Sequence, residues 1–236
     1  MLDAYLEASS LRELRSYCLI ISLFNSLFVH QNFPGNFSSS NFSVLHIMFI
    51  THKGTKTLDT VRLILRRFQS SDDQAMFKYA SDKETTRFMR FPVHKSIEDS
   101  REIIRQWSEE YRNMNFYSWA IVCRECNEVI GSIAINDVNE FHRQGEVGYI
   151  IRKDHWGKGL MTEALCRVIR FCFDELNFQR LESLHSVENP ASGRVMVKAG
   201  MVNEGTKRNY FPTDHGYMDC PMYAITREDY ETAYSK

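Results

Sequence analysis

The chain has 236 residues, of which 43% are hydrophobic and 25% are charged. This balance is ordinary for a folded globular chain and argues against wholesale disorder. Lysine and arginine number 29 against 30 for aspartate and glutamate, so the formal net charge is -1. The chain has no excess positive charge with which to hold nucleic acid by counterion release, and we expect no nucleic-acid partner.

The composition changes near residue 57. It predicts a poorly ordered N-terminal extension over residues 1–56 and one domain over residues 57–236. The apolar run over residues 18–29 is too short and too polar to span a bilayer, and no secretory cleavage signal follows it. We therefore expect no stable membrane insertion and a cytoplasmic location. Met48 is an alternative start of the chain. The alternative interpretation of the apolar run is a membrane-associating helix.

Among the six cysteines, only Cys123 and Cys126 form a close pair, a single C-x-x-C. A structural zinc site usually needs a second ligand pair at similar spacing, and nearby histidines such as His142 do not supply one. The sequence therefore predicts reduced thiols and no metal site. Cys166 and Cys172 lie in an apolar helical pattern and are expected in the core.

The predicted elements alternate between strands and helices. In chain order they are a strand over 60–68, a helix over 70–80, a helix over 96–113, a hairpin of strands over 117–124 and 129–136, a strand over 146–151, a helix over 158–174, a strand over 180–187, a helix over 190–199, and closing strands over 202–211 and 217–225. This order predicts the α/β or α+β class with a mixed sheet.

Gly157 and Gly159 stand between the strand over 146–151 and the helix that follows it. Glycine adopts positive φ readily and lets a ligand approach the main chain. The free N–H groups and the positive end of the helix dipole then form an anion site, to which Lys158 adds charge. The spacing alone is also compatible with a plain tight turn. Neither a P-loop nor a dinucleotide fingerprint is present, and the physics indicates phosphate or pyrophosphate.

The run WGKGLMTEAL, residues 156–165, resembles the pyrophosphate-binding motif of the GNAT N-acetyltransferases. Trp156 and Met161 depart from the general Gln/Arg-x-x-Gly-x-Gly/Ala pattern but look like the branch that contains the ribosomal-protein N-terminal acetyltransferases. The segment VENPASGRVMVKAGM and the closing strands are similar to the same branch. The resemblance covers residues 58 to about 230 and implies a GNAT fold with a mixed central sheet of about seven strands flanked by helices.

The resemblance implies acetyl-CoA as co-substrate, a primary amine as acceptor, and direct transfer in a ternary complex without an acyl-enzyme. It places the pyrophosphate on the glycine turn and the pantetheine arm along the strand over 146–151, where a backbone N–H would polarise the thioester oxygen. The cofactor-binding residues that it implies are Tyr149, Ile150, Ile151, Trp156, Gly157, Lys158, Gly159, Leu160, Met161, Thr162, Asn189 and Ser192.

Glu146 is the candidate general base, because it opens the strand that leads to the glycine turn. The alternative is a surface strand residue paired with Arg143 or Lys153. Asp137 is a weaker candidate base.

Ser192 is the candidate general acid, since the resemblance places a serine there facing the leaving thiolate. The alternative is an ordinary helix-capping residue. Met196 stands where many GNAT enzymes have a tyrosine.

The acceptor is less defined: a protein N-terminus, a small metabolite amine or an amino sugar all fit the chemistry. The branch resemblance favours a protein N-terminus modestly, because a fold does not fix a substrate. Phe88, Phe91, Tyr210 and Phe211 are candidate pocket residues, although a core role is more ordinary for aromatic side chains. A monomer or homodimer is expected. A non-catalytic acyl-CoA-binding sensor or interaction module is the alternative to an enzyme.

Overall fold

The computed structural model describes residues 49–213 and 216–234. The predictions for residues 1–48 lie outside these ranges. No helix within them combines the length and apolar character needed to cross a membrane.

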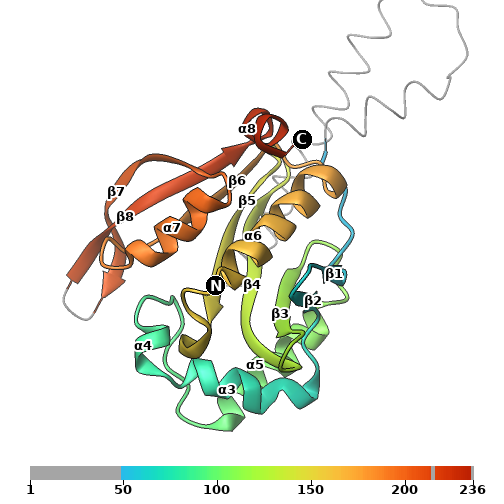
Figure 1. Cartoon of the computed structure of the whole chain (residues 1–236), viewed down its shortest axis with the longest axis vertical. Coiled ribbons are helices and arrows are strands. Elements are labelled where there is room, and N and C mark those ends of the chain that lie inside the picture. Colours follow the sequence, from blue (N-terminus) through green and yellow to red (C-terminus); the bar gives the residue numbers. More distant parts are fainter. Residues whose placement is uncertain (1–48, 214–215, 235–236) are drawn as a thin grey trace, which may run out of the picture. The chain divides into compact units, whose positions relative to one another are not determined.

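An eight-stranded mixed sheet forms the centre of the described domain (Figure 1). The strands are β1 (Leu58–Asp59), β2 (Leu63–Arg66), β3 (Tyr117–Cys123), β4 (Glu128–Asn139), β5 (Gln144–Ile151), β6 (Arg180–Leu184), β7 (Val202–Thr213) and β8 (Gly216–Thr226). Their order across the sheet is β1-β2-β3-β4-β5-β6-β8-β7, and only β5 and β6 pair in parallel. The mixed α/β class expected from the sequence is confirmed, with eight strands in the sheet where about seven were expected. The predicted strand over 60–68 is in fact a hairpin, β1 and β2, closed by Thr60 N–H to Leu63 O.

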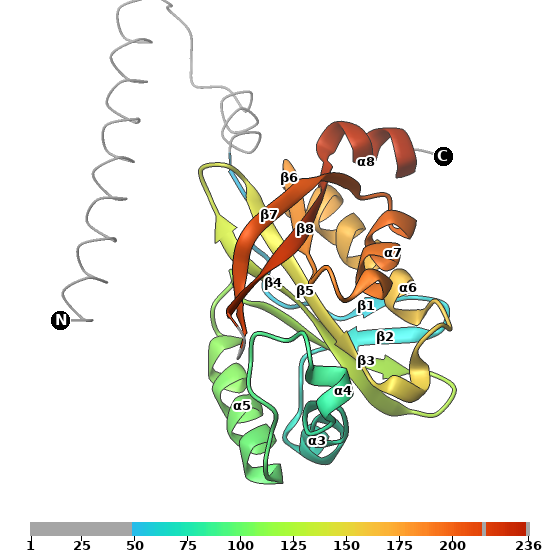
Figure 2. The same ribbon diagram turned by 90° about the vertical axis from the view of Figure 1, so that its left-hand side faces the viewer.

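The α-helices cover both faces of the sheet (Figure 2). They are α3 (Asp73–Ala80), α4 (Lys83–Thr86), α5 (Ile97–Glu110), α6 (Leu160–Arg170), α7 (Pro190–Lys198) and α8 (Arg227–Tyr234). The sequence patterns missed the short α4 and the C-terminal α8. The predicted helix over 158–174 begins at Leu160, and its last turn widens into a π-helical segment, Phe171–Glu175.

The main core lies between α6 and the sheet. Met161, Leu165, Val168 and Cys172, the predicted apolar stripe of α6, are all at most 5% exposed. Trp119 on β3 is fully buried and meets Phe171 edge to face. A second core, which includes Phe68, Met76 and Ile104, lies beneath α3 and α5. Because helices cover both faces, every residue of β3 is buried, as expected of a central strand.

Residues 49–56, which composition groups with the extension, pack against this domain. Ile50 joins the main core, and Thr51 N–H donates to Leu176 O at 2.8 Å. Thr55 is 2% exposed and its hydroxyl donates to Phe116 O. The ordered part of the domain therefore begins before residue 57.

The sheet opens between β5 and β6. Their parallel pairing comprises only Gln144 with Arg180, Gly145 with Leu181 and Glu146 with Glu182. Beyond these pairs β5 continues along β4, whereas β6 continues along β8. In Figure 1, β7 and β8 accordingly run toward the lower left while β4 and β5 run downward. At the start of the opening the Ser183 hydroxyl donates to Val147 O at 2.9 Å, in place of a backbone ladder.

Candidate active site

Two connected cavities occupy the opening. The first, of about 230 Å³, passes between β5 and β6, and we call it the split cavity; among its lining residues are Phe88, Arg90, Phe91, Asn136, Glu146, Gly148, Tyr149, Ser192, Phe211 and Cys220. The second, of about 390 Å³, runs from the split to the glycine turn, and we call it the glycine-turn groove; it is lined by residues of β5, the glycine turn, α6, α4 and α7. Tyr149, Ile150, Asn189 and Ser192 line both, so the two spaces form one continuous site.

The glycine turn has the geometry of an anion cradle. Gly157 and Gly159 have φ values of 73° and 75°, which non-glycine residues rarely adopt. Gly159 is the N-cap of α6, and among the described residues no side chain caps this helix end. The first N–H groups of α6 therefore keep their hydrogen-bonding capacity for a ligand, and the helix dipole favours a negative one. A Cβ on Gly157 would meet nothing within 4 Å, so the turn is open to an approaching phosphate.

An arginine in the turn between β1 and β2 fixes the glycine turn. Arg62 donates through Nη1 to Lys158 O at 3.0 Å and through Nε to Glu163 at 2.6 Å. Glu163 also accepts hydrogen bonds from the Thr60 hydroxyl and the Arg62 backbone N–H. Burial disfavours the charged form of Glu163, but these hydrogen bonds outweigh it and hold its pKa below the ordinary value. The sequence analysis missed this clamp, because its two halves lie about a hundred residues apart.

The structure brings together the cofactor residues that the resemblance implies, with one exception. All of them except Lys158 line the glycine-turn groove. Lys158 contributes its carbonyl to the clamp instead. The groove also has basic residues that sequence reasoning did not find: Arg87, Arg194 and Lys198 line it, and Arg87 pairs with Glu188 at 2.7 Å. Cations on both sides of the groove suit a ligand with several phosphates.

Glu146 lies at the other end of the site, in the split cavity. Its side chain is 15% exposed and pairs with the guanidinium of Arg90 at 2.8 Å. Arg90 belongs to the loop between α4 and α5, so the ion pair is neither of those considered from the sequence; Lys153 pairs with Glu84 instead. Asp137, the weaker candidate base, is exposed and lines neither cavity.

Ser192 is held from two sides. Asn189 is the N-cap of α7, and its side-chain oxygen accepts a hydrogen bond from the Ser192 backbone N–H at 3.4 Å. The Ser192 backbone carbonyl accepts from the Tyr149 hydroxyl at 3.0 Å. Burial raises the pKa of Tyr149, although a hydrogen bond with the Ser192 side chain acts in the opposite direction. Tyr149 therefore stays protonated at neutral pH and keeps its hydrogen bond to Ser192.

The candidate pocket aromatics divide between two spaces. Phe88, Phe91 and Phe211 line the split cavity. Phe91, Tyr210 and Phe211 also line a surface hollow of about 520 Å³ that lies beside it. The core alternative is wrong for Phe91 and Tyr210, which are 37% and 42% exposed.

Together these features define a class of protein. A sheet that opens beside a helix N-terminus can hold an extended ligand that carries phosphate. The free strand edge pairs with the extended arm of the ligand, and the helix N-terminus binds its phosphate groups. A carboxylate and a hydroxyl pair at the same opening can move protons at the far end of that ligand. This is the architecture of an acyl-CoA-dependent acyltransferase.

Comparison with known proteins specifies the family. The model of the acetyltransferase (GNAT) domain matches residues 62–202, and the chain belongs to this family. It is an acetyl-CoA-dependent N-acetyltransferase. The glycine turn, the N–H groups at the start of α6 that no side chain caps, and the basic residues of the groove fit that co-substrate.

The relatives are similar over most of their length. An uncharacterized N-acetyltransferase, YoaA of Bacillus subtilis, is 31% identical over 170 residues, which cover 72% of this chain and 96% of that protein. The ribosomal-protein-serine acetyltransferase of Escherichia coli is 26% identical over 129 residues, covering 55% of this chain and 71% of the relative. A GNAT-family acetyltransferase structure from Bacillus anthracis superimposes with a TM-score of 0.65 at 25% identity, covering 73% and 99% of the two chains.

Proposed function

We propose that this acetyltransferase passes the acetyl group directly to a primary amine, with Glu146 as general base and Ser192 as general acid. The observation that carries the proposal is that both residues line the split cavity, which continues into the glycine-turn groove. Acetyl-CoA supplies a thioester carbon that an amine can attack. With its phosphates at the glycine turn, its arm extends along β5 toward the split, so the reacting carbon comes to the space between the two side chains.

The base has to remove a proton from the acceptor, because amines are ammonium ions at neutral pH. Glu146 already holds a cation, the guanidinium of Arg90, at the wall of the cavity. Arg90 is 45% exposed and belongs to a loop, so it has solvent into which to withdraw. An arriving ammonium group then replaces one positive partner of Glu146 by another and loses its proton to the carboxylate, directly or through water.

The attack forms the new carbon–nitrogen bond and breaks the carbon–sulfur bond, and the departing sulfur needs a proton. Ser192 is placed to donate it, since its side chain lies at the split and its backbone is fixed by Asn189 and Tyr149. The Tyr149 hydroxyl donates to the Ser192 carbonyl and so holds this residue in position. The ammonium nitrogen gives up two protons: the first passes to Glu146, and the second, lost as the amide forms, replaces the proton that Ser192 gave to the sulfur. The products are an amide and free coenzyme A, with one proton left on Glu146.

The acceptor that we propose is the N-terminal amine of a protein. The surface hollow formed by Met89, Arg90, Phe91, Tyr210, Phe211 and Pro212 lies beside the split cavity and is open to solvent. Such a surface suits the side chains that follow a terminal amine, whereas a small amine needs an enclosed pocket. The resemblance to the ribosomal-protein branch, and the name of the Escherichia coli relative as a ribosomal-protein-serine acetyltransferase, support the same acceptor class.

The test is the release of free thiol from acetyl-CoA in the presence of an amine panel. The panel contains peptides with alanine or serine at the N-terminus, the same peptides with a blocked N-terminus, a polyamine and an amino sugar. We expect turnover with the free peptides and none with the blocked ones. Turnover of the polyamine or amino sugar alone would contradict the protein acceptor while preserving the amine-transfer chemistry. The cytoplasmic location and the monomer or homodimer remain predictions.

A further inference from the structure

A cluster of potential metal ligands lies beside the glycine turn. Cys123 ends β3, Cys126 lies in the turn that leads to β4, and His155 ends the 3-10 segment η2 (Lys153–His155). Their ligand atoms, two Sγ atoms and a ring nitrogen, all lie within 4.8 Å of one another. The C-x-x-C pair lacks a third ligand nearby in the sequence, because the third member, His155, follows β5 in the chain.

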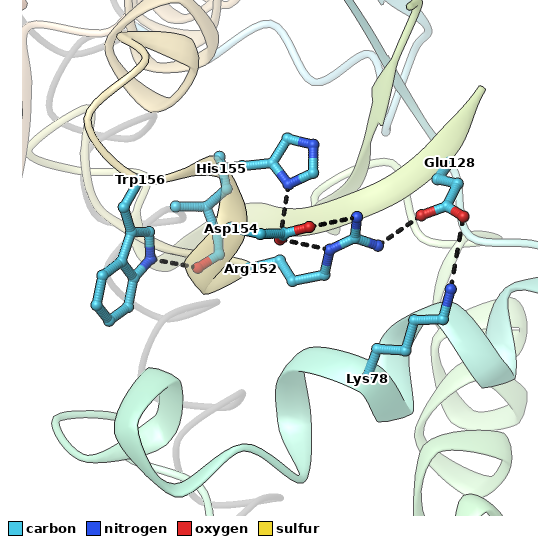
Figure 3. Close-up of polar contacts among 7 residues, drawn as sticks. Lys78, Glu128, Arg152, Asp154, His155 and Trp156 are labelled. Atoms are coloured by element: carbon cyan, nitrogen blue, oxygen red, sulfur yellow. Dashed lines mark hydrogen bonds and ion pairs between the residues drawn. The ribbon is translucent and has the colours of Figure 1, made fainter. Parts of the chain in front are cut away.

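The histidine of this cluster is oriented as metal-bound histidines are. Its Nδ1 contacts Asp154 Oδ1 at 2.8 Å, and Asp154 is itself held by Nε and Nη2 of Arg152 at 2.7 and 2.9 Å. Glu128 accepts from the same guanidinium (Figure 3). A carboxylate at Nδ1 fixes the tautomer in which that nitrogen carries the proton, so Nε2 keeps its lone pair for a metal. Figure 3 shows this second ring nitrogen directed away from Asp154.

The two sulfur atoms also have suitable surroundings. Cys123 is 5% exposed, so the cluster extends from the surface into the domain. Cys126 is exposed, which leaves a path for an ion to enter. Two thiolates balance the charge of a divalent cation, while the charge of Arg152 is already balanced by Asp154 and Glu128.

We propose that Cys123, Cys126 and His155 bind a thiophilic divalent cation, with Zn²⁺ as the expected ion. Two thiolates and an imidazole are a known zinc ligand set, in which the fourth tetrahedral position is taken by water or another small ligand. His155 precedes Trp156 and Gly157 directly and lines the glycine-turn groove. The ion therefore ties the β3–β4 turn to the wall of the co-substrate groove.

The proposal can be tested on the full chain, reduced and freed of metal with a chelator. Titration with Co²⁺ should produce the charge-transfer absorption of cobalt–thiolate bonds, saturating at one ion per chain, and Zn²⁺ should displace it. Cys126→Ser and His155→Gln should each weaken Co²⁺ binding by at least tenfold. Cys166→Ser changes another incompletely buried thiol, on α6, and is the matched control that should bind as the unaltered chain does.

A second readout measures the link to the groove. Because the ion restrains the segment before the glycine turn, Zn²⁺ should tighten acetyl-CoA binding severalfold in calorimetry, and Cys126→Ser should lose this increment while it still binds acetyl-CoA. Absence of cobalt–thiolate absorption, or equal absorption in Cys126→Ser, would overturn the metal site. So would a chain that takes up no metal when reduced and closes a Cys123–Cys126 disulfide in air.

Discussion

The two ends of the active site are built differently. At the co-substrate end, the glycine turn and the first turn of α6 form one continuous run, residues 156–162, and β5, α4 and α7 complete the groove. The acceptor end is assembled from separate segments: the loop after α4, the start of β5, and both strands of the β7–β8 hairpin. A contiguous run leaves a motif in the sequence, whereas a wall made from distant segments leaves none.

The ends also differ in how firmly they are held. At the co-substrate end, Glu163 receives three hydrogen bonds from Thr60 and Arg62, and Arg62 also holds Lys158. At the acceptor end, the ion pair of Arg90 and Glu146 joins a half-exposed loop side chain to the cavity. The comparison indicates a fixed cradle for acetyl-CoA and an acceptor wall that can rearrange when the amine enters.

The largest expected effect is on chemistry at the acceptor end. Glu146→Gln keeps the shape of the side chain but removes its basicity, so turnover should fall by about 10²-fold or more, with acetyl-CoA affinity little changed. The deficit should shrink as pH rises, because more of the amine is then neutral without help. The measurement is a pH–rate series.

The matched control is Glu182→Gln. Glu182 pairs in register with Glu146 across the strands, but its carboxylate is bound by Arg180 at 2.6 Å and lines neither cavity. We expect it to retain most of the activity. Near-normal turnover of Glu146→Gln at neutral pH would show that another group or ordered water is the base.

The next effect concerns the co-substrate end. Gly159→Val places a branched side chain at φ 75° and in the path of the pyrophosphate, so acetyl-CoA should bind about 10²-fold more weakly. Calorimetry measures the affinity, and circular dichroism checks the fold. Gly205→Val introduces the same side chain at another positive φ, 117°, in β7 and outside the groove, and should leave binding unchanged. Equal affinities for both variants would refute the anion cradle.

A smaller effect tests the hydroxyl pair at the junction of the two ends. Ser192→Ala should lower turnover by about five- to tenfold, as expected for one hydrogen bond of roughly 1–1.4 kcal/mol. Tyr149→Phe should have a similar effect, and the double variant should be little worse than either, because Tyr149 acts through Ser192, whose backbone carbonyl it holds. Additive losses in this double-mutant cycle would show that the two groups act independently.

The smallest effect is expected from removing residues 1–47. A chain that begins at Met48 should melt within a few degrees of the full chain and bind acetyl-CoA equally well. A chain that begins at Thr57 loses the burial of Ile50 and the hydrogen bonds of Thr55, and its melting temperature should fall by roughly 5–15 °C. Loss of acetyl-CoA binding in the chain that begins at Met48 would show that residues before 48 support the groove.

The sequence by itself determined the family and the co-substrate. Strand periodicity, the stripe of α6 and the run WGKGLMTEAL are local, and local patterns survive in a linear sequence because the forces that they reflect act between near neighbours. The sequence also indicated the aromatic residues at the acceptor end. It did not predict how exposed their side chains are, because exposure depends on which segments pack against them.

The tertiary structure alone decided which side chains meet. The partnership of Arg90 with Glu146, the clamp of Arg62 on Glu163 and the meeting of His155 with the C-x-x-C turn all join residues that are far apart in the chain. Strand order sets these contacts: the parallel pairing of β5 with β6 ends after Glu146, and the opening that follows makes the site. No local pattern encodes where two strands part, because that is decided by the packing of the whole sheet.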